Sequence, residues 1–382
     1  MNEVGEIVKL TEVKLKDISK NNRGYYGIGA SAANYDEKKY TYLRITDIND
    51  DGTLNKTSLM SVDDEKANEF LLKENDIVFA RTGASTGRSY FYDGEINNMV
   101  FAGFLIKFSL DEEKVNPRFI KYYCISQNYK NWIASSLTGS TRPNINEKQL
   151  SEMPIILPER EYQNRVVKVL DAIIKKIELN NQINENLLEI GIELLKNQFK
   201  DSELENLSNV IKFVKGKKPD DITSYKKEKY EKYLTIACLN GQELNYADAT
   251  KMIISNNDLL MVMDGASSGD VYYGGYGIVG STLARIDCFN KKYISEYIFF
   301  AMKYYKELIQ SKNTGSAIPH TDKVFVSNLK IPIISMEIQE KYKGLLAKIQ
   351  QNIIENEKLI KLRDTILPKL MNGEIDLDKI EI

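Results

Sequence analysis

The segment RTGASTGR, residues 81–88, carries the side chains best suited to ligand chemistry in the first half of the chain. Its glycines flank short hydroxyl side chains, so hydroxyls and backbone amides are available to phosphate, and arginine suits the O6 and N7 atoms of guanine. Two alternatives stay open: the hydroxyls cap a turn that the glycines allow, or the arginines form surface ion pairs. The candidate nucleic-acid contacts are Arg81, Thr82, Ser85, Thr86 and Arg88.

The same pattern returns in the second half of the chain. Residues 253–270 repeat residues 71–88 at a constant offset of 182 (265 − 83), which places Ser267 and Ser268 in a second glycine-flanked loop. A repeat of this length indicates a duplicated domain. Because the glycines recur while the flanking charges do not, we interpret Gly83 and Gly87 as scaffold.

A second repeat pairs TGSTRPNI at 138–145 with TGSAIPHT at 314–321. Asparagine can pair with adenine through two hydrogen bonds, which makes this segment a second source of base contacts. It adds Thr141, Arg142, Asn144 and His320 to the candidates. His320 is the only histidine, and its counterpart is Asn144, so the two halves cannot share a catalytic histidine. A lone histidine is more often structural or a binding contact.

A lysine cluster, KFVKGKKP, precedes a proline in the second half of the chain. It can bind phosphate, or it can be an ordinary solvated loop. We count Lys215, Lys217 and Lys218 as candidate phosphate contacts.

Catalytic chemistry is hard to place in this sequence. The three cysteines are scattered without metal-ligand spacing, and no GKS or GKT follows either glycine-flanked loop. We predict no catalytic residue and no metal site. The 52 basic and 54 acidic residues give a net charge of −2, which argues against a protein that coats nucleic acid by bulk charge but permits a local basic face.

The elements that must position these residues follow the same repeat. Residues 39–48, 75–82, 88–95 and 100–110 are predicted strands, residues 117–136 have helical spacing, and the second half repeats this order. Strands mixed with few helices and no regular crossover indicate α+β domains. We predict four segments: a domain over 1–158, a long helix over 159–200, a domain over 201–335, and a helix with a tail over 336–382.

Each predicted long helix carries one unbroken heptad pattern, as a coiled-coil seam requires. The patterns begin at Tyr162 and Ile338, and at this offset of 176 Asn180 aligns with Asn356. If the helices pair antiparallel about a pseudo-twofold axis, the two amides meet and fix the register. The alternative is that both asparagines lie in water at the edge of the seam.

The order of these motifs resembles the specificity subunits of type I restriction–modification systems over essentially the whole chain. The resemblance rests on NDIVFARTGASTGRSYFYDGE at 75–95, GSTRPNINEKQLSEMPIILPEREYQNRVV at 139–167 and LIKLRDTILPKLMNGEIDL at 359–377. The second half departs from this pattern, because MDGASSGD and AIPHT replace ARTGASTGR and TRPNI. Phosphate contacts by Arg81, Arg88 or Arg142 are therefore not assumed for that half.

The resemblance implies two similar target-recognition domains joined by two long antiparallel coiled-coil helices. Such subunits read a split sequence in double-stranded DNA, one half per domain, and the helices act as a ruler. Because the domains differ, we expect an asymmetric site. Two methyltransferase subunits with S-adenosylmethionine would methylate adenine at N6, and ATP-dependent restriction or translocating subunits can join them. This chain would bind no cofactor and catalyse nothing itself.

Two other functions are compatible with a repeat and a spacer. One is an adaptor that bridges protein partners on a coiled-coil strut without DNA. The other is the fused recognition half of a methyltransferase, which the missing catalytic segments disfavour. No apolar run approaches membrane-spanning length, and the few scattered cysteines suit a reducing compartment, so we expect a cytoplasmic protein without a membrane partner.

Overall fold

The computed structural model of this chain describes residues 8–137, 143–315, 318–375 and 377. The chain forms two compact units, here called the first unit (Met1–Lys176 with Lys358–Ile382) and the second unit (Ile177–Glu357). Each unit contains one globular domain and part of both long helices. The four-segment division at 158, 200 and 335 stays a prediction.

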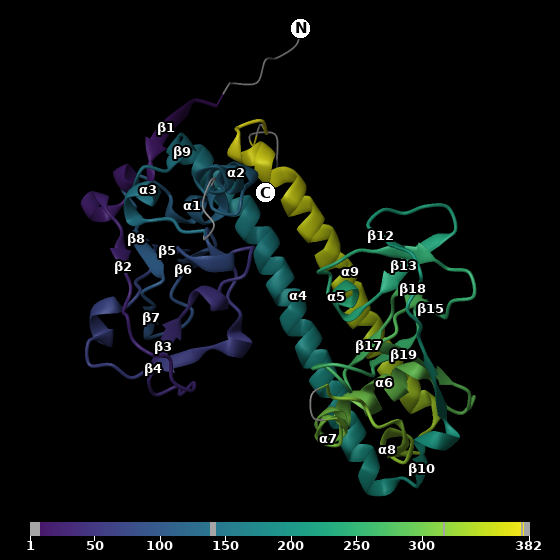
Figure 1. Cartoon of the computed structure of the whole chain (residues 1–382). Helices are drawn as coiled ribbons and strands as arrows, with labels where there is room; N and C mark the ends of the chain where they lie inside the picture. Colours follow the sequence, from purple (N-terminus) through teal and green to yellow (C-terminus); the bar gives the residue numbers. More distant parts are fainter. Residues whose placement is uncertain (1–7, 138–142, 316–317, 376, 378–382) are drawn as a thin grey trace. The chain divides into compact units, whose positions relative to one another are not determined.

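The first unit is built on three small sheets (Figure 1). The four-stranded sheet has the order β2-β8-β5-β6, the three-stranded sheet has the order β4-β3-β7, and β1 pairs with β9. The strands are β1 (Leu10–Lys14), β2 (Tyr25–Tyr26), β3 (Tyr40–Leu43), β4 (Met60–Val62), β5 (Asp76–Ala80), β6 (Ser89–Tyr92), β7 (Met99–Phe101), β8 (Leu105–Ser109) and β9 (Pro154–Pro158). The helices of its domain are α1 (Pro117–Tyr123), α2 (Gln127–Ser136) and α3 (Glu147–Ser151).

Two predicted elements of the first unit are each divided in the structure. The single strand expected over 100–110 is β7 and β8, because the chain turns where Leu105 N–H donates to the Ala102 carbonyl at 2.8 Å. The helix expected over 117–136 is α1 and α2, because α1 ends at Tyr123 and the hydroxyl of Ser126 caps α2. Both predictions were wrong about continuity, since an apolar pattern does not reveal a turn inside it.

The second unit repeats the four-stranded sheet in the order β11-β19-β16-β17, beside a five-stranded sheet in the order β12-β14-β13-β18-β15 and the pair β10-β20. Its strands are β10 (Leu204–Asn206), β11 (Ile211–Lys215), β12 (Ile222–Thr223), β13 (Tyr230–Leu234), β14 (Tyr246–Asp248), β15 (Ile254–Asn256), β16 (Leu259–Val262), β17 (Val271–Tyr273), β18 (Tyr276–Val279), β19 (Leu283–Cys288) and β20 (Lys330–Pro332). Its short helices are α5 (Ile236–Leu239), α6 (Ser295–Tyr304), α7 (Lys306–Ser311) and α8 (Lys323–Ser327). The shared strand order confirms the predicted α+β class and the duplication.

The two long helices, α4 (Arg160–Asp201) and α9 (Met336–Met371), complete the core of both units. In the first unit, Val166 and Leu170 of α4 and Leu370 of α9 lie in the same buried cluster as the sheet. In the second unit, Leu195 of α4 and Tyr342 of α9 lie in the buried cluster that contains the four-stranded sheet. Each long helix therefore buries part of its apolar stripe in the first unit and part in the second.

The two aligned asparagines meet inside the second unit. The amide of Asn180 donates to Asn356 Oδ1 at 2.9 Å, and both side chains are buried. Four residues further along α4, Oδ1 of Asn184 accepts a hydrogen bond from the side-chain amide of Asn352 at 2.8 Å. Residue numbers therefore rise along α4 as they fall along α9. The helices are antiparallel here, and the predicted contact is present. Among the described residues, no helix is long and apolar enough to cross a membrane.

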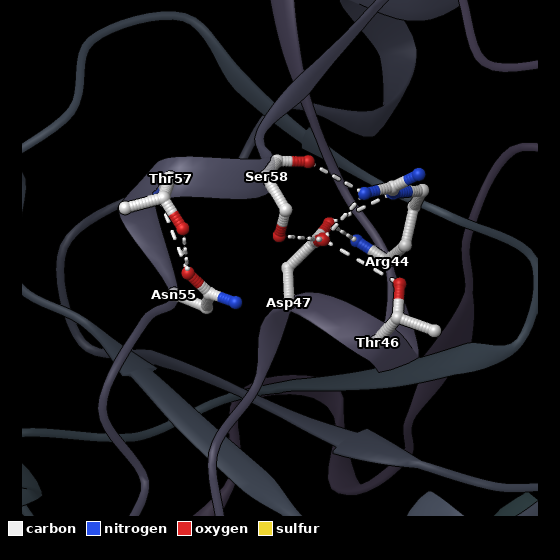
Figure 2. A network of polar contacts seen from close by, with 6 residues as sticks. All are labelled: Arg44, Thr46, Asp47, Asn55, Thr57 and Ser58. Atoms are coloured by element: carbon white, nitrogen blue, oxygen red, sulfur yellow. Dashed lines mark hydrogen bonds and ion pairs between the residues drawn. The ribbon is translucent and has the colours of Figure 1, made fainter. Parts of the chain in front are cut away.

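A buried carboxylate fastens the loop after β3 in the first unit. Asp47 is fully buried and accepts three hydrogen bonds from Arg44: one from the backbone N–H and two from the guanidinium, at 2.6–3.0 Å (Figure 2). Arg44 also donates to the Ser58 carbonyl at 2.7 Å. A buried charge is tolerated only when it is paired in this way. The network holds residues 44–58 in place.

Candidate nucleic-acid interface

The two repeated motifs of each half come together in the fold. Thr82 forms a β-bridge with Asn144 in the first unit, and Asp264 forms the same bridge with His320 in the second. We call these the first and second junctions. Each is closed by a glycine amide that donates to a proline carbonyl, from Gly83 at 3.2 Å and from Gly265 at 2.9 Å. The sequence placed these segments about sixty residues apart, so only the fold joins them.

The last hydroxyl of each loop fastens its junction. Thr86 Oγ1 donates to the carbonyl of Gly83 at 2.7 Å and lies 3.2 Å from that of Pro143. Ser268 Oγ lies 2.7 Å and 2.8 Å from the equivalent carbonyls, and Ser268 is fully buried. These two hydroxyls therefore cap the loop, which was one of the alternatives. Ser85 is buried and Ser267 is half-buried, and contact of any of these hydroxyls with DNA stays a prediction.

Gly87 shows why the loop needs glycine. Its φ is +89°, and a Cβ there would lie 2.6 Å from Cγ2 of Ile133 on α2. Gly269 in the second unit has a φ of +93° and would meet Ile309 at 2.9 Å. Both the backbone conformation and the close helix exclude a side chain. This supports the interpretation of the recurring glycine as scaffold.

Arg88 forms an ion pair within its own unit. Its Nε donates to Asp50 at 2.6 Å, and its Nη1 donates to the Ile48 carbonyl at 3.1 Å. The loop that supplies both acceptors is the one held by the buried Asp47. Arg88 thus adopts the alternative of a surface ion pair, and its contact with DNA stays a prediction.

Arg81 is placed very differently from Arg88. Its guanidinium carbon lies 5.0 Å from the ring centroid of Tyr26, and its buried Nε has no hydrogen-bond partner among the described residues. The backbone N–H of Arg81 donates to the backbone carbonyl of Phe104 at 3.0 Å. Tyr26 is 43% exposed, so an arginine that has no anionic partner among the described residues lies over an exposed aromatic ring, and the backbone beside it belongs to Phe104, whose side chain is 60% exposed. This combination suits phosphate and stacked bases.

Tyr26 and Phe104 were absent from the predicted site. Phe104 lies in the turn between β7 and β8, which the sequence showed as the middle of one strand. Tyr26 precedes Gly27, and Lys215 precedes Gly216; a Cβ on either glycine would lie 2.2 Å from a backbone carbonyl of the neighbouring strand. In the sequence only the two glycines are visible, and their offset of 189 (216 − 27) differs from the 182 of the loop repeat, so the close approaches became apparent only in the structure.

The second junction carries an amine, a carboxylate and an imidazole at three positions where the first unit has uncharged residues. Asp264 lies 3.0 Å from the amino group of Lys215 and 2.8 Å from Nδ1 of His320. Burial raises the pKa of Asp264, but hydrogen bonds from His320 and Lys215 outweigh it and hold the pKa below its usual value. The equivalent positions of the first unit hold three uncharged residues: Tyr26, Thr82 and Asn144. Asp264 was not among the predicted contacts.

The remaining predicted contacts are less constrained by the fold. Lys217 and Lys218 are exposed, and neither forms an ion pair with another described residue. Asn144 is exposed. Thr141 and Arg142 lie outside the described residues. For all of these, contact with DNA stays a prediction.

No part of the described chain gathers three or more potential ligands of the histidine, cysteine and carboxylate types into a metal site. Cys124 and Cys238 are buried. Burial raises the pKa of the half-buried Cys288 to about 11, so its side chain stays in the protonated thiol form, which is a poor nucleophile. These cysteines have the properties of structural residues.

Comparisons with known proteins agree on one family. The profile of the family described as "Type I restriction modification DNA specificity domain" matches residues 7–189 and 199–364. The chain is 31% identical over 150 residues to the type I restriction enzyme MjaVIII specificity subunit of Methanocaldococcus jannaschii, a match that covers 38% of this chain and 35% of that protein. It is 23% identical to the HindI specificity subunit of Haemophilus influenzae, over 80% of this chain and 87% of that protein.

A solved structure has the same fold. The type I restriction–modification S subunit from M. genitalium superposes with a TM-score of 0.55 at 17% identity, over 97% of this chain and 98% of that chain. At this identity the match speaks for the architecture alone.

Proposed function

The chain belongs to the family of type I restriction–modification DNA specificity domains and is a specificity subunit of such a system, and on that premise we propose that each unit reads one half of a bipartite double-stranded DNA site. The observation that carries the proposal is the junction, which occurs once in each unit with the same backbone frame. A fixed frame with variable side chains suits recognition of two different sequences.

The two junctions differ enough to favour an asymmetric site. The first offers the guanidinium of Arg81 over the ring of Tyr26 and the exposed amide of Asn144. The second offers a charged group of Lys215, Asp264 and His320. Arginine pairs with guanine and asparagine pairs with adenine, whereas a carboxylate accepts from cytosine. Equal half-sites would require equal chemistry, so the two halves of the DNA site should differ.

The partners in this proposal are two adenine-N6 methyltransferase subunits, joined by restriction or translocating subunits where the system contains them. S-adenosylmethionine and ATP would be bound by those partners, and the chain would act as a non-catalytic cytoplasmic subunit. Exposed apolar side chains on α4 and α9 support docking of protein partners, because such residues on a helix favour an interface. They include Leu179, Ile183, Ile190, Ile353, Ile354, Ile360 and Leu362.

We further propose that the helices set the gap between the two half-sites. The 42 residues of α4 extend about 63 Å at 1.5 Å per residue. Inserting one heptad into both helices should lengthen the unspecified gap by about three base pairs, since seven residues add about 10.5 Å and base pairs rise about 3.4 Å. Both half-sites should stay the same. An unchanged gap in a folded variant would refute the ruler.

A genome-wide map of N6-methyladenine, in cells with and without the gene, tests the whole proposal. We expect methylation at one split, asymmetric motif to disappear with the gene and to return when it is restored. An unchanged map in cells that express this chain and active methyltransferase subunits would favour the adaptor without DNA. A methyl-transfer assay on the isolated chain separately tests the absence of catalysis.

A further inference from the structure

The only histidine of the chain lies in a charged trio at the second junction. Nδ1 of His320 is 2.8 Å from Asp264 Oδ1, and the amino group of Lys215 is 3.0 Å from Asp264 Oδ2. The imidazole is 51% exposed, although Asp264 is only 24% exposed. The imidazole of His320 is therefore accessible to a ligand, while the carboxylate of Asp264 is fixed by its contacts with Lys215 and His320.

The carboxylate decides which nitrogen of the ring is free. An ionised carboxylate only accepts hydrogen bonds, so Nδ1 of His320 carries the hydrogen that it shares with Asp264. Nε2 then presents a lone pair when the ring is neutral and an N–H when the ring is protonated. Within the described residues the ring forms no other hydrogen bond, so Nε2 is the atom available to a ligand.

We propose that His320 is a proton-dependent DNA contact of the second unit and that Asp264 is its positioning residue. This inference rests on the proposed function and deepens it. Phosphate oxygens and the O6 and N7 atoms of guanine are all acceptors. They repel the lone pair of a neutral Nε2 and accept a hydrogen bond from a protonated one. DNA binding by the second unit therefore takes up a proton at His320.

Among the described residues, the other groups that contact the ring or its backbone keep their charge or have none. Asp264 stays ionised across the range in which imidazoles titrate, because Lys215 and His320 hold its pKa below the usual value against the opposing effect of burial. Thr314, which pairs with the backbone of His320, and Gly315, which packs on its ring, carry no charge. Protonation of His320 thus changes the trio from net neutral to net positive.

The first unit lacks this device. At the positions of Lys215, Asp264 and His320 it has Tyr26, Thr82 and Asn144, none of which is an amine, a carboxylate or an imidazole. The proton dependence should therefore belong to one half of the DNA site. Asn144 also supplies the matched replacement, because His320→Asn gives the second junction the residue that the first one uses.

The test measures DNA binding by the complex of the full chain with its methyltransferase subunits. The probe is a fluorescent duplex that carries the split motif methylated in cells, and its anisotropy is measured between about pH 8 and about pH 5.5, the range of imidazole titration. For the unmodified complex, the affinity should rise about tenfold more over this range than for His320→Asn, as a single charge-assisted hydrogen bond allows. Asp264→Asn should lose most of that rise. Circular dichroism verifies that both variants are folded.

Each outcome bears on the proposal. Parallel pH profiles for the unmodified complex and His320→Asn would overturn it, and so would an affinity that falls on acidification only when the histidine is present. A duplex with a scrambled second half separates the two acceptors: loss of the proton dependence indicates guanine, and retention indicates phosphate. If the motif binds no better than a fully scrambled duplex at any pH, the proposed function itself fails.

Discussion

Replacing Gly87 by alanine should damage the first junction from within. The residue has a φ of +89°, and the new Cβ would lie 2.6 Å from Cγ2 of Ile133, with two further carbons of that side chain at 3.1 Å. Two separate costs arise, one from the backbone conformation and one from the collision with α2. Gly83 in the same loop separates them, because it has a φ of +72° and no atom within 4 Å of its would-be Cβ.

The magnitudes follow from these two costs. A left-handed conformation costs a residue with a Cβ about 1–2 kcal/mol, so Gly83→Ala should lower the free energy of unfolding by about that amount. Overpacking adds about 1–3 kcal/mol, so Gly87→Ala should lower it by about 2–5 kcal/mol. Shortening the opposing side chain makes room. Gly87→Ala combined with Ile133→Ala should therefore be more stable than the sum of the single effects, by at least about 1 kcal/mol.

Equilibrium urea denaturation of the native chain, the three single variants and the double variant, followed by circular dichroism, measures these differences. Equal costs for Gly83→Ala and Gly87→Ala would show that the helix yields and that the close approach is unimportant. Additive effects of Gly87→Ala and Ile133→Ala would refute the collision with Ile133. In cells, a folded Gly87→Ala variant should lose specificity in one half of the methylated motif only, because the second unit keeps its own junction.

Three further predictions concern the helices, the first junction and a surface carboxylate. Asn180→Leu should destabilise the second unit by about 1–3 kcal/mol, because it leaves the buried amide of Asn356 with an unpaired acceptor, and adding Asn356→Leu should recover much of this in urea denaturation. Arg81→Ala should weaken binding of the motif about tenfold or more in anisotropy titrations. The control is Arg23→Ala, which removes an arginine that lies over the ring of Tyr25 and should have a smaller effect. Hydrogen bonds from Lys14 and Lys16 lower the pKa of Glu152 to about 2. The ionised carboxylate therefore stabilises the fold above its ordinary pKa, and this stabilisation disappears as the pH falls through the lowered pKa. The melting temperature of Glu152→Gln should be lower than that of the native chain above about pH 4.5 and equal to it near pH 2.

Several features could be predicted because they depend on local pattern. The duplication is visible as recurring glycines, and a glycine such as Gly87 recurs because its backbone conformation and close helix admit nothing larger. The heptad aligned Asn180 with Asn356, since the period of a helix determines which residues can face its partner, and the structure decides between a facing pair and the edge of the seam in favour of the pair. Part of the order of strands and helices in each half was also readable, but a turn divides the predicted elements at 100–110 and 117–136, and short strands such as β2 and β4 were not predicted.

The chemistry of the site depended on contacts between distant segments. Arg81 and Arg88 flank the same loop, yet Arg88 forms an ion pair with Asp50, whereas Arg81 lies over Tyr26 and has no acidic partner among the described residues. Nothing in their local sequence distinguishes them, because the partners come from strands and loops about forty to sixty residues away. The pairing of Asp264 with His320 was hidden for the same reason.

The sequence by itself indicated a duplicated α+β protein with two long helices, and the function came from the resemblance of its motifs to those of type I specificity subunits. Periodicity and repetition are properties of neighbours along the chain, and they survive without coordinates. Only the tertiary structure decided which polar side chains are used in internal hydrogen bonds and which stay accessible to a ligand. The hydroxyl of Ser268 is buried, whereas the ring of His320 is exposed. A side chain's availability depends on what packs against it, and β-bridges between distant segments set that packing here.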